Sequence, residues 1–406
     1  MQEKAAIRAS ANIDFGISGK VVLLSGLTLS SYALFGLSPV LPAIAAHFSY
    51  IPDAGMLTRL LISAAGIAVA VTSPIVGAIA DRFGARRVLI LGLIVYALAG
   101  CAPFFLDSLY AILVSRIVMG LAIAAVGAVI LAILVTHSSG AARNRWLGYL
   151  TTTATIVSVF YSPVVGYIGR FGWRWPFLTF LFALPLVVLT VIGIARDPER
   201  MMVTKRSEGT SKSAGFSLGT PLGFIIFVLV AGAVLVSPGV YIPFRLREMG
   251  ITDSGSIGML LIPASIAGVG AGFSYGWVRS KLSMSLTFVI GFSAMAAGLL
   301  TTAMAHDSLQ VVVGQVMTGF GTGINMPSIF VLASLAGSDA FRARTMGFAK
   351  SGVYGGPMLG QLLLEPVIVH TNFAMVLSLL SLGCAAFAVH YARQVIIANR
   401  APVQQA

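Results

Sequence analysis

The chain has 406 residues, of which 57% are hydrophobic and 10% are charged, and its mean hydropathy is +0.94. A soluble globular domain carries about 25% charged residues, and a disordered chain lacks this many apolar residues, so the composition excludes both classes. The formal net charge of +13 would suit a nucleic-acid-binding protein, and the positions of the charges must decide that question.

Apolar segments long enough to cross a membrane recur along the whole chain. About 20 helical residues span the roughly 30 Å of a bilayer's hydrocarbon core. Twelve spans are predicted, at 21–46, 60–80, 88–106, 108–136, 146–168, 175–195, 221–244, 254–278, 282–305, 308–336, 345–369 and 373–392. We therefore expect an all-α integral membrane protein, surrounded by membrane lipid.

The basic residues are distributed unevenly between the segments that join these spans. With the N-terminus in the cytoplasm, twenty Lys and Arg residues fall on inner segments and five on outer ones. Positive charge accumulates on the cytoplasmic side of membrane proteins, so both termini are predicted to be cytoplasmic, in a bacterial inner membrane. The net charge then reflects topology, and we expect no nucleic-acid partner.

A hydrophilic segment over 196–220 divides the spans into six and six. We read it as a cytoplasmic linker between a bundle at 1–195 and a second at 221–406. Short matches between the halves recur at an offset of 199 to 200 residues, for example Gly120 with Gly319, and this offset sets Arg116 opposite Gln315. Two pseudo-symmetric six-helix bundles are typical of transporters, whose substrate site lies between the bundles near mid-membrane.

The segment between the second and third spans reads Gly77-Ala-Ile-Ala-Asp81-Arg82-Phe-Gly84-Ala-Arg86-Arg87. It resembles the signature loop of the major facilitator superfamily, with one residue inserted before the basic pair. The resemblance implies a secondary transporter, not an enzyme, that needs no cofactor. It also implies a conformational gate in which Asp81 contacts the eleventh span, with gate residues Gly77, Asp81, Arg82, Gly84, Arg86 and Arg87. The simpler alternative is a basic turn that obeys the positive-inside rule.

Arg116 lies about two turns into the fourth span. A charge within hydrocarbon is costly and faces a cavity or a partner, and the position is similar to the family's span-four arginine, implicated in proton coupling or in binding an anionic group. The alternative is an arginine that snorkels to the interface. Glu365 is the one acidic residue within a predicted span, so the proton-coupling candidates are Arg116, Glu365 and Asp81, although Glu365 could equally be an interfacial residue.

Proline and small residues mark the fifth and eleventh spans. Ser158-Val-Phe-Tyr-Ser162-Pro163-Val-Val-Gly166 and Gly352-Val-Tyr-Gly-Gly356-Pro357-Met-Leu-Gly360 resemble an antiporter motif of the family. Small residues allow close helix approach, and proline bends a helix. The predicted hinge residues are Pro163, Gly166, Gly352, Gly356, Pro357 and Gly360, with ordinary proline kinking as the alternative.

Two further patterns bear on function. Pro39-Val-Leu-Pro42 in the first span is similar to a step in the drug–proton antiporter branch, but the preceding Tyr32-Ala-Leu-Phe35 carries no acid. Gly319-Phe-Gly321-Thr-Gly323 could resemble a phosphate-binding loop, but its apolar setting favours tight helix packing. The histidines have no metal-ligand spacing, so no metal site is predicted.

The sequence thus favours a monomeric transporter that exports small amphipathic organic compounds, driven by protons. Aromatic and Met side chains give adaptable apolar contacts. The residues expected to bind substrate are Tyr32, Phe35, Arg116, Met119, Tyr161, Gln315, Asn325, Met326 and Tyr354. The missing acid in the first span keeps a second interpretation open, an importer or facilitator of a small organic anion such as a metabolite or siderophore. A membrane-embedded enzyme or a sensor is a more remote alternative.

Overall fold

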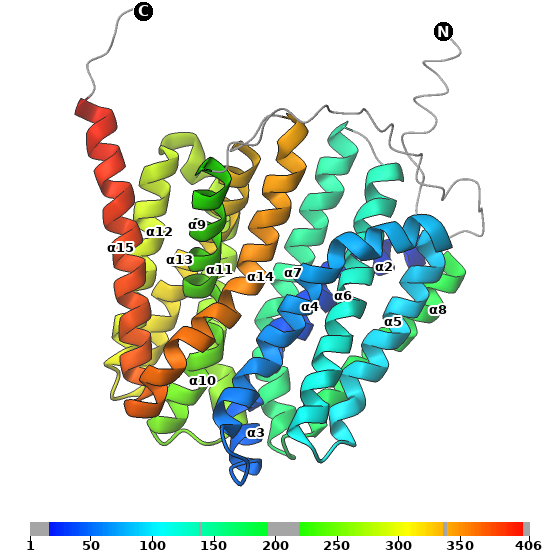
Figure 1. Ribbon diagram of the computed structural model, residues 1–406, viewed down its shortest axis with the longest axis horizontal. Helices are drawn as coiled ribbons and strands as arrows, with labels where there is room; N and C mark the ends of the chain where they lie inside the picture. The colour runs from blue at the N-terminus through cyan, green and yellow to red at the C-terminus, as the bar shows by residue number, and fades with distance from the viewer. Residues whose placement is uncertain (1–15, 138–139, 194–218, 336–338, 401–406) are drawn as a thin grey trace, which may run out of the picture. The chain divides into compact units, whose positions relative to one another are not determined.

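The structure, a computed structural model, describes residues 16–137, 140–193, 219–335 and 339–400 (Figure 1). Within these residues every regular element is helical, and the helices group into twelve spans in the predicted order. The first six spans are α2 (Ile17–Phe35) with η1 (Ser38–Val40) and α3 (Leu41–His47), α4 (Ala54–Phe83), α5 (Ala85–Cys101) with η2 (Ala102–Phe104), α6 (Leu109–His137), α7 (Gly140–Gly169), and η3 (Trp175–Phe182) with α8 (Ala183–Gly193). The last six are α9 (Gly219–Val236) with α10 (Pro238–Glu248), α11 (Ser254–Lys281), α12 (Met284–Ala303), α13 (Ser308–Leu335), α14 (Asp339–His370) and α15 (Phe373–Arg400). The all-α membrane fold is confirmed.

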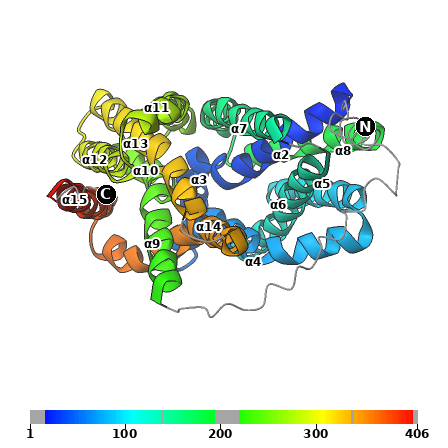
Figure 2. The ribbon, with the colours of Figure 1, turned by 90° about the horizontal axis from the view of Figure 1, so that it is seen from above.

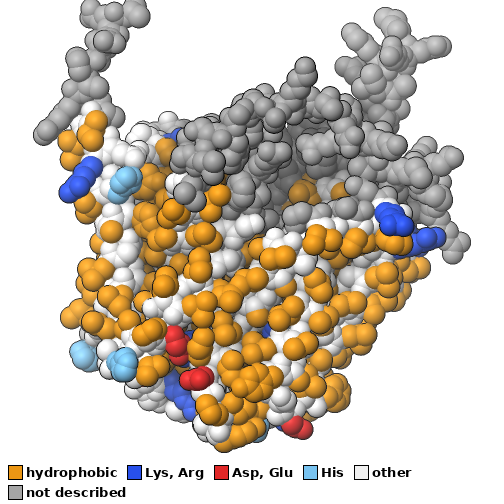
Figure 3. All heavy atoms as spheres, viewed as in Figure 1, with side chains coloured by type: hydrophobic (Ala, Val, Ile, Leu, Met, Phe, Trp, Pro, Cys, Tyr) orange, Lys and Arg blue, Asp and Glu red, His pale blue; other side chains and the backbone are white. Residues whose placement is uncertain are grey.

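Among the residues described, ten of these spans are long and apolar enough to cross a membrane by length and composition. Those of α7 and α14 fall outside that set, and α7 contributes the shorter apolar stretch Ile156–Gly169. On the face shown in Figure 3, hydrophobic side chains cover the middle of the helices and charged side chains lie toward their ends. This distribution is the one that a lipid environment requires.

Two spans are interrupted at prolines. The first span leaves the α conformation between α2 and α3, where Ser38 precedes Pro39 in the short helix η1. The seventh span breaks between α9 and α10, where Ser237 precedes Pro238. Proline has no backbone N–H to donate, and its ring clashes with the carbonyl four residues earlier, which explains both breaks.

The chain forms two compact units. The first comprises Met1–Leu37, His47–Tyr161 and Phe171–Gly215, and the second comprises Ser38–Ala46, Ser162–Arg170 and Phe216–Ala406. Short pieces of the first and fifth spans therefore pack with the second unit. The domain boundaries at 195 and 221 remain a prediction, since most of the linker lies outside the described residues.

Each unit has the same close helix contact at its centre. In the first unit a Cβ atom on Gly120 of α6 would overlap the carbonyl of Ala65 in α4, and in the second a Cβ atom on Gly319 of α13 would overlap that of Ala264 in α11. Both members of the contact are shifted by the same 199 residues. The internal repeat read from the sequence is therefore also a repeat of packing.

The glycine run of α13 serves helix packing, as the sequence indicated. Gly319 and Gly323 lie against α11, whereas Gly321 lies against Gly291 and Met295 of α12. Figure 2 shows α13 beside both helices. A side chain at any of these glycines would force the helices apart, which explains the residue type without a phosphate ligand.

Candidate functional site

The first unit buries a charge at its centre. The Arg116 side chain in α6 has no exposed surface, so the interpretation that it snorkels to the interface was wrong. Its Nη2 donates hydrogen bonds to the carbonyls of Ala99 at 3.0 Å and Gly100 at 2.9 Å. These carbonyls belong to the last turn of α5, where backbone acceptors lack intrahelical partners and the helix dipole is negative. The guanidinium therefore caps α5.

Two aromatic rings complete the surroundings of this charge. The guanidinium carbon of Arg116 lies 5.3 Å from the ring centroid of Phe177 and 5.1 Å from that of Phe180, both in η3. A cation over an aromatic face is stabilised by the ring quadrupole, and more strongly in a desolvated site. Within the described part of the chain, Nε and Nη1 of Arg116 have no hydrogen-bond partner. The side chain reaches a helix end and two rings rather than open space.

A layer of tyrosines lies next to the arginine. The ring centroids of Tyr32 and Tyr161 are 5.0 Å apart, and that of Tyr32 is 5.1 Å from Phe180. Tyr96 lies 5.6 Å from the same phenylalanine. The structure thus brings together Tyr32, Arg116 and Tyr161, three of the residues predicted to bind substrate. Phe180 contacts Arg116 and Tyr32, and Tyr32 contacts Tyr161.

The tyrosine hydroxyls anchor this layer to one helix. Tyr161 donates to the carbonyl of Thr28 at 2.6 Å, and Tyr96 donates to that of Leu29 at 2.9 Å. Both acceptors are consecutive residues of α2, so rotation or bending of α2 would disturb the tyrosines of two other spans. We name the set Tyr32, Tyr96, Arg116, Tyr161, Phe177 and Phe180 the arginine–aromatic cluster.

Sequence reasoning missed half of this cluster. Tyr96, Phe177 and Phe180 were not among the predicted residues, nor was Thr179, whose hydroxyl pairs with that of Tyr32. The spacing of Phe177 and Phe180, three residues apart, places both on one helix face. That signal alone cannot show that the face meets the arginine of another span.

The other predicted residues of the first unit lie beside the cluster in sequence. Met119 is fully buried, three residues after Arg116 in α6, and Phe35 is half-buried at the end of α2. Their roles in substrate binding stay predictions.

The predicted residues of the second unit are mostly buried between helices. Asn325 of α13 has no exposed surface and lies against Gly291 of α12. Its amide oxygen and nitrogen have no hydrogen-bond partner in the part of the chain described. Gln315 is 1% exposed, and Met326 and Tyr354 are half-buried. Asn325 therefore occupies a helix contact here, and binding of substrate by these four residues remains a prediction.

The predicted gate loop joins α4 to α5 through one residue. Gly84 has φ of +90°, a backbone conformation that residues with a Cβ atom rarely adopt. Arg86 donates to the carbonyl of Val191 at the end of α8 at 2.8 Å, while Arg82 and Arg87 are exposed. The surroundings of Gly77 and of the Asp81 side chain lie outside what the structure describes, so the contact expected between Asp81 and the eleventh span is still a prediction.

The predicted hinge glycines of α14 all face one neighbour. Cβ atoms on Gly352, Gly356 or Gly360 would clash with or press on α9, while Pro357 stands inside the same helix. In α7, Pro163 lies inside the helix and Gly166 lies against Ser254 and Gly258 of α11. The glycines are explained by close packing, and a hinge role for these helices stays a prediction.

An ion pair joins α7 to α11 within the second unit. Nη2 of Arg170 lies 2.8 Å from Oδ2 of Asp253, and Nε also donates to the carboxylate. Asp253 caps α11 by accepting from the backbone N–H of Ser256 at 2.8 Å. These hydrogen bonds, chiefly that from Arg170, hold the pKa of the Asp253 carboxyl well below its usual value. The sequence analysis did not single out either charge.

The remaining proton-coupling candidate is Glu365, which is half-buried in α14. It therefore lies neither fully exposed nor sealed in the protein interior, and its role is untested by the geometry.

Comparisons with known proteins identify the family. Residues 23–360 match the model of the Major Facilitator Superfamily. The tetracycline resistance protein of class D from Salmonella ordonez is 24% identical over 398 residues, covering 94% of this chain and 98% of that protein. Multidrug resistance protein 1 of Bacillus subtilis is 22% identical over 382 residues, with 90% and 94% covered.

Solved structures share the fold at low identity. The nucleoside transporter NupG superposes with a TM-score of 0.75 at 15% identity, over 91% of this chain and 99% of that one. A D-xylose–proton symporter gives a TM-score of 0.72 at 15% identity, over 92% and 98%. Since the family model covers most of the sequence, the chain belongs to the Major Facilitator Superfamily, as an integral membrane secondary transporter and not an enzyme.

Proposed function

We propose that this transporter exports small amphipathic organic compounds in exchange for protons. The full-length relatives named above are a tetracycline resistance protein and a multidrug resistance protein. The similarity to these proteins supports a drug-efflux activity for this chain. At 22 to 24% identity it does not specify a substrate. In this proposal the chain acts as a monomer with both termini in the cytoplasm.

The observation that carries the proposal is the arginine–aromatic cluster. Arg116 keeps its charge in proteins, and in the described residues no carboxylate forms a salt bridge with it. Its neighbours are aromatic side chains, whose large apolar faces and polar tips suit amphipathic molecules. We propose that the positive potential of this charge favours binding of a substrate or of a proton-carrying carboxylate nearby.

A permanently charged arginine cannot itself carry a proton through a transport cycle. In the proposal the carrier is a carboxylate, Glu365 or Asp81, which can lose and regain its proton as access alternates. Arg116 would favour the deprotonated form of a carboxylate that approaches it. The gate loop between α4 and α5 and the hinge helices α7 and α14 would supply the conformational change.

Transport by purified protein in proteoliposomes tests this proposal. Tetracycline and a cationic dye serve as probes, with an imposed pH gradient and a protonophore control. We expect movement of at least one probe to follow the gradient, to stop when the protonophore dissipates it, and to acidify the compartment that loses substrate. Substrate movement that ignores the gradient would contradict proton exchange.

A second function is favoured by one feature of the sequence. The first span carries no acid near Tyr32 and Phe35, and the buried cation of the cluster would favour an anion. The chain would then be an importer or facilitator of a small organic anion. Uptake of a labelled organic anion in the direction of its own gradient, unaffected by the pH gradient, would favour this function over export.

A further inference from the structure

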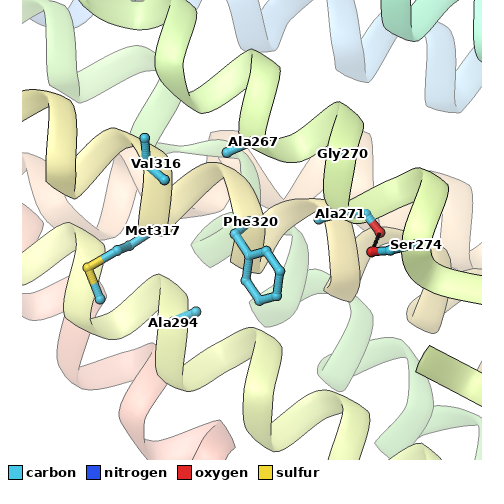
Figure 4. A pocket seen from close by; sticks show the side chains of 8 residues that line it. All are labelled: Ala267, Gly270, Ala271, Ser274, Ala294, Val316, Met317 and Phe320. Carbon is cyan, nitrogen blue, oxygen red and sulfur yellow. Dashed lines mark hydrogen bonds between the residues drawn. The ribbon is translucent and has the colours of Figure 1, made fainter. Parts of the chain in front are cut away.

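The second unit carries a groove on its surface, apart from the arginine–aromatic cluster. It has a volume of about 390 Å³ and lies between α11 and α12, with α13 as its floor. Figure 4 shows Phe320 of α13 in this space, with Ala267 and Ala271 of α11 on one side and Ala294 of α12 on the other. The small side chains of the walls create the space that the larger ring partly fills.

The groove borders the helix contacts of α13. Gly319 and Gly323 occupy the contact with α11, and Gly321 occupies that with α12. On the remaining face, Val316 and Phe320 stay 44% and 37% exposed. An exposed apolar face on a membrane-spanning helix is one that hydrocarbon can cover.

Few polar groups are available inside the groove. Ser274 carries the one polar side chain of the lining, and its hydroxyl donates to the carbonyl of Ala271 at 3.0 Å. A polar substrate would find nothing here to fix its orientation. A hydrocarbon chain needs no such partner.

A cation continues the same helix face. Lys281 follows Ser274 by seven residues, which is two helical turns and about 10 Å along α11, so both lie on one stripe. Nζ of Lys281 lies 4.4 Å from the ring centroid of Trp277, which is 64% exposed. Tryptophan settles at the level of lipid headgroups, and a cation there attracts anionic headgroups.

We propose that this groove binds an anionic phospholipid, with one acyl chain along Ala267, Gly270 and Phe320 and the headgroup phosphate on Lys281. The lipid comes from the leaflet that meets the C-terminal end of α11. The proposal follows from the apolar groove and the cation at its end, and it is independent of what the protein transports.

Filling the groove tests the position of the acyl chain. A Cβ atom on Gly270 meets no atom within 4 Å, and the same holds for Gly272, which does not line the groove. Gly270→Leu therefore fills the space, and Gly272→Leu is its matched control. Native mass spectrometry of delipidated protein with added palmitoyl-oleoyl phosphatidylglycerol should show adducts with the unmodified protein and with Gly272→Leu. For Gly270→Leu we expect weaker binding, on the order of tenfold, because several methylenes lose their contact.

Removing the cation tests the headgroup. Lys281→Gln should weaken phosphatidylglycerol binding by about fivefold and leave palmitoyl-oleoyl phosphatidylcholine binding unchanged. Arg393→Gln, which removes an exposed cation from α15, is the control and should change neither.

A measurement on the unmodified protein covers the case in which a variant misfolds. Phosphatidylglycerol with brominated acyl chains should quench tryptophan fluorescence more than the brominated phosphatidylcholine, and Trp277→Phe should remove the difference. Equal quenching by the two lipids would overturn the proposal. So would equal adduct loss in Gly270→Leu and Gly272→Leu, or a dimer of the chain that Gly270→Leu abolishes in place of a lipid adduct.

Discussion

The two units have equivalent helices but different contacts at one equivalent position. The repeat places Arg116 of α6 and Gln315 of α13 at equivalent positions. In the first unit the arginine reaches the final carbonyls of α5 and packs under two phenylalanines. In the second, α12 and α13 approach so closely that Gly298 and Gly314 have no room for a side chain. The two units thus share their helix frame, and a buried charge occurs at this position in only the first.

The largest effect is expected from removing this difference. Arg116→Met should lower the initial rate of transport in proteoliposomes by at least about tenfold, if the charge interacts with substrate or carrier as proposed, because an interaction with a charged group contributes about 1.5–3 kcal/mol. Gln315→Met should lower the rate by less than Arg116→Met does, because it removes no charge and no hydrogen bond of Nε2 to the described residues. Size-exclusion profiles of both variants check that they fold. Equal losses of transport would show that the charge is not what distinguishes the units.

Because the two units share the same helix contact, equivalent Gly→Ala substitutions should destabilise them equally. Gly120→Ala and Gly319→Ala should each lower the free energy of unfolding by about 1–3 kcal/mol, the usual cost of overpacking, because both new methyl groups meet a helix backbone. Gly270→Ala, with open space at its Cβ position, is the control and should change little. Unfolding in mixed micelles measures all three. A penalty in one unit alone would contradict the equivalence of the contacts.

A smaller effect comes from the loops that precede α5 and α12. Gly84 directly precedes α5 and has φ of +90°. Ser283 directly precedes α12, has φ of −63° and accepts a hydrogen bond from the N–H of Leu286 at 3.2 Å. Gly84→Ala should therefore cost roughly 1–2 kcal/mol through strain.

At the second of these loops, Ser283→Ala should cost about 1 kcal/mol and Ser283→Gly only a few tenths. Thermal unfolding of the three variants separates backbone strain at the first loop from the lost side-chain cap at the second. A larger loss for Ser283→Gly than for Ser283→Ala would contradict the capping role.

The smallest effect is expected at the ion pair of the second unit. The side chains of Arg170 and Asp253 are 49% and 40% exposed, so water and salt screen their attraction. The pKa of Asp253 is lower in the folded protein than its ordinary value of 3.8. The ionised carboxylate therefore contributes to the free energy of unfolding at pH values above 3.8. This contribution is lost as the pH falls through the pKa of the folded state.

Asp253→Asn should therefore lower the unfolding temperature slightly, by an amount that stays constant between about pH 5 and 8. The difference from the unmodified protein should shrink only in stronger acid and in high salt. A difference that grows on acidification would show that another group titrates in this contact.

Much of the architecture followed from the sequence because it depends on local properties. The length of each apolar run and the glycine spacing of 319–323 act within one helix or between two adjacent helices. The offset of 199 residues that relates Gly120 to Gly319 could likewise be read along the chain.

The surroundings of Arg116 could not be read in this way. The sequence established that a buried charge needed partners, and it left a cavity, another residue or the membrane interface open. In the tertiary structure the partners of Arg116 are the carbonyls at the end of α5 and the rings of Phe177 and Phe180. The physical reason is that a helix's apolar length decides whether it spans the membrane, whereas its rotation about its own axis decides which side chains meet. That rotation is set by packing against helices distant in sequence.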